Sequence, residues 1–232
     1  MNAPNRSRAL WIFIACLCLM EGAVFGAPPE LLPFWKLPAV ELPPKLLPAK
    51  VELVAGPDLT RALALFDPDH KVTNPLTEPF VKKADEDYRV VPSGLVKGAK
   101  PFSDRNYTIS VLPDRLAGLT QLQTRMSHKN IIDGRFGIAL SVARPVYLFV
   151  AMDERMLKTF AQTGTPSWMQ DFAPTGDRIL TDDPLMKATE SGYLIFVKKC
   201  PAGRIVLGPC GANPKYNSMY FTFLAEAGQD GR

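Results

Sequence analysis

Apolar and polar residues alternate with a period of two over much of the chain from Asp104 onward. This is the period of a half-buried β-strand, and the runs are separated by Pro, Gly and Asp, which favour turns. The strongest signals are two aromatic and β-branched runs, residues 147–150 and 220–224. The pattern predicts strands at residues 105–112, 119–126, 135–142, 146–152, 192–199, 204–207 and 218–225.

The connections between these runs favour an antiparallel sheet, because no long helical pattern alternates with them as it does in parallel sheets. We predict an all-β domain, an antiparallel β-sandwich, over residues 101–225. Pro201-Ala202-Gly203 is typical of a tight hairpin connection. The long interruption at residues 154–183 is predicted to hold one short helical turn after Pro166, since proline suits the start of a helix.

The first 27 residues have the three-part pattern of a secretory signal peptide. Arg6 and Arg8 precede an apolar run at residues 9–20, and small residues surround the expected cleavage after Gly26 or Ala27. The run is shorter than the ~20 apolar residues of a transmembrane helix, so we expect no membrane span after cleavage. An uncleaved N-terminal anchor is the alternative. The prediction is a secreted, periplasmic or cell-surface protein.

Residues 28–50 contain seven prolines, which excludes a helix and favours an extended, semi-rigid chain. An irregular proline-rich linker is the simpler interpretation, and a docking segment is the alternative. Phe34 and Trp35 are unusual in a pure spacer, so part of this arm is expected to pack on the domain or on a partner. Residues 51–100 are predicted to be an irregular connector, with a strand at residues 88–92 as the exception.

The formal net charge of +4 is small. Removal of residues 1–27 takes away Arg6, Arg8 and Glu21 and lowers it by one, to +3. Because the basic residues are spread along the chain and form no stripe, no nucleic-acid partner is expected.

The cysteines are interpreted in light of the predicted export from the cell, because disulfides form outside the cytosol. Cys200 and Cys210 are the cysteines that remain after signal cleavage, and in an exported chain such a pair predicts a disulfide. Two reduced thiols are the alternative, since a simple hairpin would carry Cys210 away from Cys200 unless Gly208-Pro209 turns the chain back. The spacing does not favour zinc, and no metal or other cofactor is predicted.

Signatures of catalysis are missing from the sequence. It has no nucleophile elbow, no His-Glu-x-x-His pair and no phosphate-binding glycine loop, so we predict that the protein is not an enzyme. His128 is interpreted as a surface residue of a basic loop. Asp177, Asp182 and Asp183 lack regular calcium-loop spacing and are interpreted as a solvated acidic turn.

Two places combine charged and aromatic residues. Asp153 and Arg155 follow a predicted strand and precede Trp168, a combination that suits sugar hydroxyls beside an aromatic face. The structural alternative is an ion pair that pins a loop under a core tryptophan. Asp104-Arg105-Asn106-Tyr107 is the second place, where Tyr107 is the weaker ligand candidate and the Asp-Arg pair at a strand start is more simply structural.

Several segments in order resemble a β-sandwich module found at the C-termini of large secreted bacterial hydrolases and lyases. They are the string Phe102-Ser103-Asp104-Arg105-Asn106-Tyr107-Thr108, then Leu112-Pro113, residues 146–155, Pro166-Ser167-Trp168-Met169, residues 201–208 and Met219-Tyr220. The resemblance implies a galactose-binding-like, jelly-roll sandwich with an accessory, carbohydrate-binding role and no catalytic residue.

Two functions follow as hypotheses. The first is a secreted, non-catalytic module that binds polysaccharide or glycan through Asp153, Arg155 and Trp168, with Tyr107 in a lesser role. The second is an envelope protein that makes protein contacts only. An exposed aromatic face beside Asp153 would favour the first, and a buried Trp168 with the arm laid over the sandwich would favour the second. A hydrolase is a distant third, because paired carboxylates need only spatial proximity.

Overall fold

A computed structural model of the chain describes residues 34–56, 88–130, 137–210 and 218–228. The predicted signal peptide, residues 1–27, and the first residues of the proline-rich arm lie outside the described residues. In the described chain, no helix is long and apolar enough to cross a bilayer.

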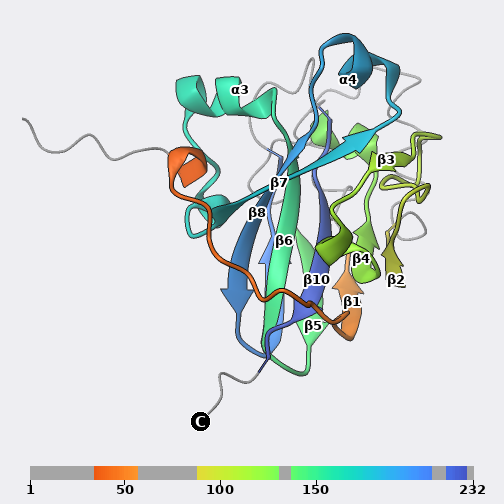
Figure 1. Cartoon of the computed structure of the whole chain (residues 1–232). Helices are drawn as coiled ribbons and strands as arrows, with labels where there is room; N and C mark the ends of the chain where they lie inside the picture. The colour runs from red at the N-terminus through yellow and green to blue at the C-terminus, as the bar shows by residue number, and fades with distance from the viewer. Residues whose placement is uncertain (1–33, 57–87, 131–136, 211–217, 229–232) are drawn as a thin grey trace, which may run out of the picture. The chain divides into compact units, whose positions relative to one another are not determined.

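Two antiparallel sheets form the domain (Figure 1). The larger has the strand order β2-β4-β10-β6-β8-β7-β3, and the smaller has the order β1-β5-β9. The strands of the larger sheet are β2 (Arg89–Leu95), β4 (Leu119–Gln123), β10 (Phe221–Glu226), β6 (Val146–Asp153), β8 (Tyr193–Cys200), β7 (Ala173–Thr181) and β3 (Ile109–Val111). The smaller sheet contains β1 (Val51–Ala55), β5 (Ile138–Val142) and β9 (Gly203–Leu207). The predicted all-β antiparallel sandwich is confirmed.

One hydrophobic core joins the sheets. It includes Leu140 and Leu207 from the smaller sheet and Phe149 and Phe223 from the larger one, whose rings stack with centroids 4.9 Å apart. Residues 221–225 of β10 are all buried although successive side chains point to opposite faces, so both faces of this strand are covered. The smaller sheet can cover only one of them.

The described part of the arm, residues 34–50, packs on the sandwich instead of standing free as a linker. Its first turn, η1 (Phe34–Lys36), places Trp35 with its ring centroid 6.1 Å from that of Phe160. Farther on, the backbone of Val40 donates to Pro174 of β7, and Pro48 forms a bridge to Ala225 of β10. Figure 1 shows this orange segment running from the region of β7 to β1. The expected packing of Trp35 is confirmed.

Two strands were not predicted. β1 follows the arm directly and pairs with β5, so the sheets begin before residue 101. β7 lies where a long loop was expected, and its register shifts between Pro174 and Arg178, with Gly176 at a positive φ of 78° between them. The expected turn after Pro166 is present as η4 (Ser167–Met169). β2 occupies the place of the strand expected at residues 88–92.

The remaining short helices border the strand ends. They are η2 (Asp114–Leu116), η3 (Met126–Asn130), α3 (Met156–Thr163) and α4 (Pro184–Ala188). Asp183 caps α4 by accepting a 2.9 Å hydrogen bond from the backbone of Leu185, and Pro184 occupies the first turn, where its missing N–H has no cost. Gly164 ends α3 with a positive φ of 83°.

β8 and β9 do not form the predicted hairpin. Pro201 and Ala202 carry the chain from the larger sheet to the smaller one, where β9 pairs with β5. The chain crosses to the smaller sheet at this short connection, and Ile205 and Leu207 of β9 then pack into the core from that sheet.

Candidate functional site

Asp153 and Arg155 form a buried ion pair at the end of β6. The Asp153 carboxylate is 0 % exposed and accepts hydrogen bonds from Nε and Nη2 of Arg155, at 2.9 and 2.6 Å. It also accepts from the backbone N–H of Arg155 at 3.0 Å and of Ser218 at 2.7 Å. We call Asp153, Arg155 and Ser218 the Asp153 clasp. Its carboxylate is fully occupied by the protein.

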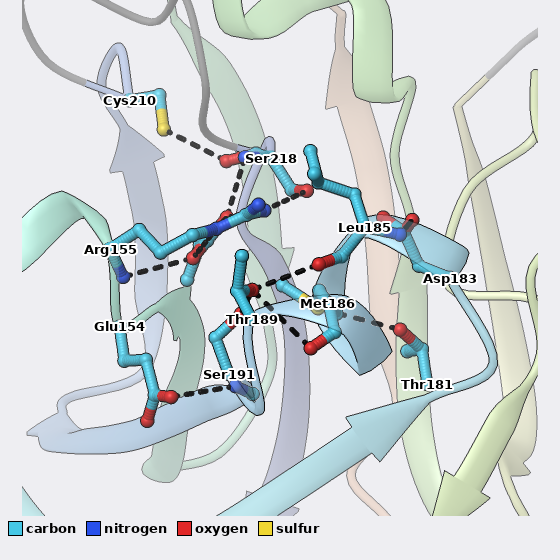
Figure 2. Close-up of polar contacts among 12 residues, drawn as sticks. Glu154, Arg155, Thr181, Asp183, Leu185, Met186, Thr189, Ser191, Cys210 and Ser218 are labelled. Atoms are coloured by element: carbon cyan, nitrogen blue, oxygen red, sulfur yellow. Dashed lines mark hydrogen bonds and ion pairs between the residues drawn. The ribbon is translucent and has the colours of Figure 1, made fainter.

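The electrostatics of the clasp favour the charged form of Arg155. Burial lowers the pKa of Arg155, but the hydrogen bond and the charge of Asp153 outweigh it and raise that pKa above its usual range. Figure 2 shows the Arg155 side chain reaching toward Ser218, whose hydroxyl lies 3.4 Å from Nη2. The structure thus brings Asp153 and Arg155 together as predicted, in the arrangement of the structural alternative.

The predicted disulfide is not formed, because Cys200 and Cys210 are free, buried thiols. Cys200 pairs with Val146 at the first residue of β6. Cys210 lies near the last residue of β6, since its thiol donates to the carbonyl of Ser218 in the Asp153 clasp (Figure 2). The ends of an eight-residue strand are about 23 Å apart, whereas bridged α-carbons lie within about 7 Å. Burial raises the pKa of Cys210 to about 12.

Trp168 is half-buried and is held by packing. Its Nε1–H donates to the carbonyl of Pro209 at 2.9 Å, and its ring centroid lies 5.1 Å from that of Tyr220. A Cβ on Gly208 would meet the indole Cδ1 at 2.3 Å, so glycine is required for this close approach. The indole therefore packs on the segment after β9, and part of its side chain remains exposed.

A second polar region is the loop at residues 96–108, which we call the Arg105 loop. It is fastened at its middle by Phe102, whose buried ring packs against Tyr193 and Phe221. The backbone of Ser103 donates to Thr124, the residue after β4, at 2.8 Å. At the end of the loop, Thr108 donates its backbone N–H and its hydroxyl to the carboxylate of Asp182. These hydrogen bonds, chiefly the one from the backbone N–H, hold the pKa of the Asp182 carboxyl below its usual range.

Residues 103–107 of the Arg105 loop line an open hollow of about 500 Å³. Asp104 forms part of its wall and accepts a 2.8 Å hydrogen bond from the backbone of Met126. The Arg105 side chain is 37 % exposed, and Asn106 is exposed with its Oδ1 accepting from Lys100 at 2.9 Å. Tyr107 is half-buried, with part of its ring against the core. A fixed backbone therefore presents a guanidinium, an amide and an aromatic ring.

Tyr88 and His128 form a buried pair that interacts electrostatically with Asp104. The Tyr88 hydroxyl lies 2.6 Å from Nδ1 of His128, and the two rings stack with centroids 5.4 Å apart. Burial, together with the positive charge of Arg125, lowers the pKa of His128 to about 4. The prediction of a surface histidine is wrong, because the side chain is 0 % exposed. A lone histidine in a basic stretch carries no signal of burial.

The three aspartates considered for calcium have separate tasks. Asp177 pairs with Arg115 at 2.6 Å, Asp182 binds Thr108, and Asp183 caps α4. Within the described ranges, no group of three potential metal ligands comes together.

No protein-family model and no curated protein matches the chain. Among solved structures, it is similar to part of a β-glucuronidase from glycoside hydrolase family 2, with a TM-score of 0.50 and 17 % identity. The match covers 62 % of this chain and 14 % of that one. A second match is a glycoside hydrolase family 138 enzyme targeting pectin rhamnogalacturonan II, with a TM-score of 0.48, 15 % identity and coverage of 83 % and 18 %. The chain thus spans a small part of either enzyme, and the likeness is one of fold.

Proposed function

We propose that the protein is a secreted, non-catalytic module that binds carbohydrate at the hollow of the Arg105 loop. The observation that carries the proposal is the hollow itself, where polar side chains and the Tyr107 ring stand on a backbone fastened by Phe102, Asp104 and Thr108. Sugars are recognised by a few fixed polar groups beside an aromatic surface. A fastened loop also lowers the entropy that binding would otherwise cost.

Within this proposal, the candidate residues fall into a structural group and a ligand-binding group according to their surroundings. Asp153 and Arg155 keep the end of β6 and Ser218 in place, and Trp168 packs the segment after β9. Tyr107 is the aromatic contact for sugar, and Arg105 and Asn106 are the polar contacts. The fold likeness to part of a family 2 glycoside hydrolase supports a carbohydrate-related setting, and the sequence resemblance supports an accessory role in it.

The signal-peptide pattern of residues 1–27 supports export, where polysaccharide is encountered. A non-catalytic role is supported by the use of Asp153, Asp177 and Asp182 in hydrogen bonds within the fold.

The test is a binding assay against a panel of neutral and acidic glycans, with wild type beside Tyr107→Ala. Tyr147→Ala is a matched control, because Tyr147 is also half-buried but lies on β6. We expect saturable binding by wild type and by the control, and at least about tenfold weaker binding by Tyr107→Ala, equal to about 1.4 kcal/mol. Near-ultraviolet circular dichroism checks that each variant is folded.

A protein-contact role is the second candidate, because the described arm lies on the sandwich as that hypothesis expected. The exposed arm residues Leu37 and Leu47, 42 % and 53 % exposed, would then contribute to the partner surface. Absence of wild-type binding to every glycan would reject the carbohydrate proposal and leave this candidate.

A further inference from the structure

The hollow of the Arg105 loop has an excess of positive charge. Arg105 lines it, Arg125 lies with its Nε 3.7 Å from the Asp104 carboxylate, and Lys100 of the same loop donates to Asn106, which lines the hollow. Asp104 is the one carboxylate among the residues that line the hollow. It is shared between two arginines, so it balances the charge of only one of them.

The Arg105 guanidinium is held in a way that leaves a binding edge available. Both of its hydrogen bonds in the described chain use Nη1, which donates to the backbone carbonyl of Asp104 at 2.7 Å and to its carboxylate at 2.9 Å. Nε and Nη2 form the opposite edge of the planar fork, and the side chain is 37 % exposed. Two parallel N–H groups on such an edge match the two oxygens of a carboxylate.

Lys100 adds a second positive charge that is not neutralised by its own contact. Its ammonium donates to the amide oxygen of Asn106 at 2.9 Å, and an amide carries no charge. Its backbone carbonyl accepts from the side chains of Gln121 and Gln123, both at 3.1 Å, which fixes the main chain at this residue. The Lys100 ammonium therefore lies beside Asn106 of the hollow, and the backbone that carries it is fixed.

We propose that the glycan bound at this hollow carries carboxylates, so that its class is uronic-acid polysaccharide. This inference rests on the proposed carbohydrate function. The Arg105 edge binds the carboxylate of one sugar in a bidentate manner, Tyr107 contacts the apolar face of a ring, and Lys100 contributes to the attraction of the polyanion.

The experiment measures the affinity of the full exported chain for polygalacturonate, alginate and a glucuronate polymer, each beside its carboxyl-reduced form. We expect wild type to bind at least one acidic polymer about tenfold or more tightly than its reduced form. Arg105→Gln should bring that ratio below about threefold, chiefly through weaker binding to the acidic polymer, and near-ultraviolet circular dichroism checks that the variant is folded.

Two controls separate a specific carboxylate contact from general attraction by a basic protein. Arg204→Gln removes the same charge from an exposed position on β9 and should keep the wild-type ratio. Dextran sulfate, a polyanion without carboxylates, should bind at least about tenfold more weakly than the preferred acidic polymer.

The outcomes distinguish the two proposals. Equal binding of the acidic and reduced polymers, an equal effect of Arg105→Gln and Arg204→Gln, or tight binding of dextran sulfate would overturn the uronate inference, while glycan binding lost in Tyr107→Ala would still support the proposed function. Absence of binding to every glycan, acidic or neutral, would reject both.

Discussion

The Asp153 clasp and the Arg105 loop start from similar sequence, an aspartate next to or near an arginine, and the fold gives them opposite surroundings. In the clasp, the arginine side chain is 16 % exposed and the carboxylate 0 %, and the carboxylate receives five hydrogen bonds from Arg155 and Ser218. In the loop, the arginine is 37 % exposed and donates through one nitrogen only.

The difference shows that the spacing between charged residues does not reveal their role. A buried charge must be paired within the protein, because desolvation without a partner costs several kcal/mol. A partly exposed arginine keeps its hydration and can exchange water for a ligand. The burial of the charged side chains therefore distinguishes a structural ion pair from one that can bind a ligand, and this burial depends on strands that are distant in the sequence.

The largest expected effect is that of Asp153→Asn. The change removes the charge that balances buried Arg155, so we expect the free energy of unfolding to fall by about 3–5 kcal/mol. Urea unfolding measures this loss. Asp171→Asn is the matched control, since Asp171 is 77 % exposed and pairs with Lys198 at the surface, and it should cost less than about 1 kcal/mol. Equal losses in the two variants would remove the basis of the comparison.

The pH dependence of stability tests the buried pair of Tyr88 and His128. His128 has a folded pKa of about 4, against 6.5 for an ordinary histidine, so the unfolded chain binds the proton more readily. The stabilisation that neutral His128 gives the folded protein is fully present above pH 6.5. As the pH falls from 6.5 to about 4, the free energy of unfolding decreases by about 3 kcal/mol.

This loss is measured as the difference in urea stability between wild type and His128→Gln over that range. His70→Gln should keep the wild-type slope, since it leaves His128 in place. A wild-type slope in His128→Gln would contradict the assignment.

The smallest stability effect is expected for Arg105→Gln. Because the side chain is partly exposed and bonds only to its neighbour Asp104, its loss should change the free energy of unfolding by less than about 1 kcal/mol. Arg155→Gln, the same substitution in the clasp, should cost several times more, because it leaves Asp153 buried without its cation. A large loss in Arg105→Gln would mean that the loop is a structural element like the clasp.

Strands with a continuous pattern were predictable from the sequence, as residues 147–150 and 220–224 show in β6 and β10. β7 was not, because Pro174 and Gly176 interrupt the alternation that identifies a strand. β1 was hidden by the prolines before it, and its partner β5 lies far away in the sequence. Local patterns contain no information on such distant pairing.

The candidate site was less predictable. Tyr107 was identified, and it lies at the hollow, but Asp104, Arg105 and Asn106 gained their interest only when the fold fastened Phe102 and Thr108 on either side. Asp153, Arg155 and Trp168 were chosen for their residue types, which suit a sugar site and a packed loop equally well. The burial of Asp153 supports the structural interpretation of the ion pair, and it depends on segments such as Ser218 that are remote in sequence.

The bridge between Pro48 and Ala225 also has a consequence for the order of folding. It joins positions 177 residues apart, since 225 minus 48 is 177, and a loop of that length closes slowly and at a high entropic cost. Ala49 donates its backbone N–H to Leu224 of the same strand. During synthesis the arm emerges long before β10 exists, so this early segment must wait for the last strand of the sheet before it reaches its native place.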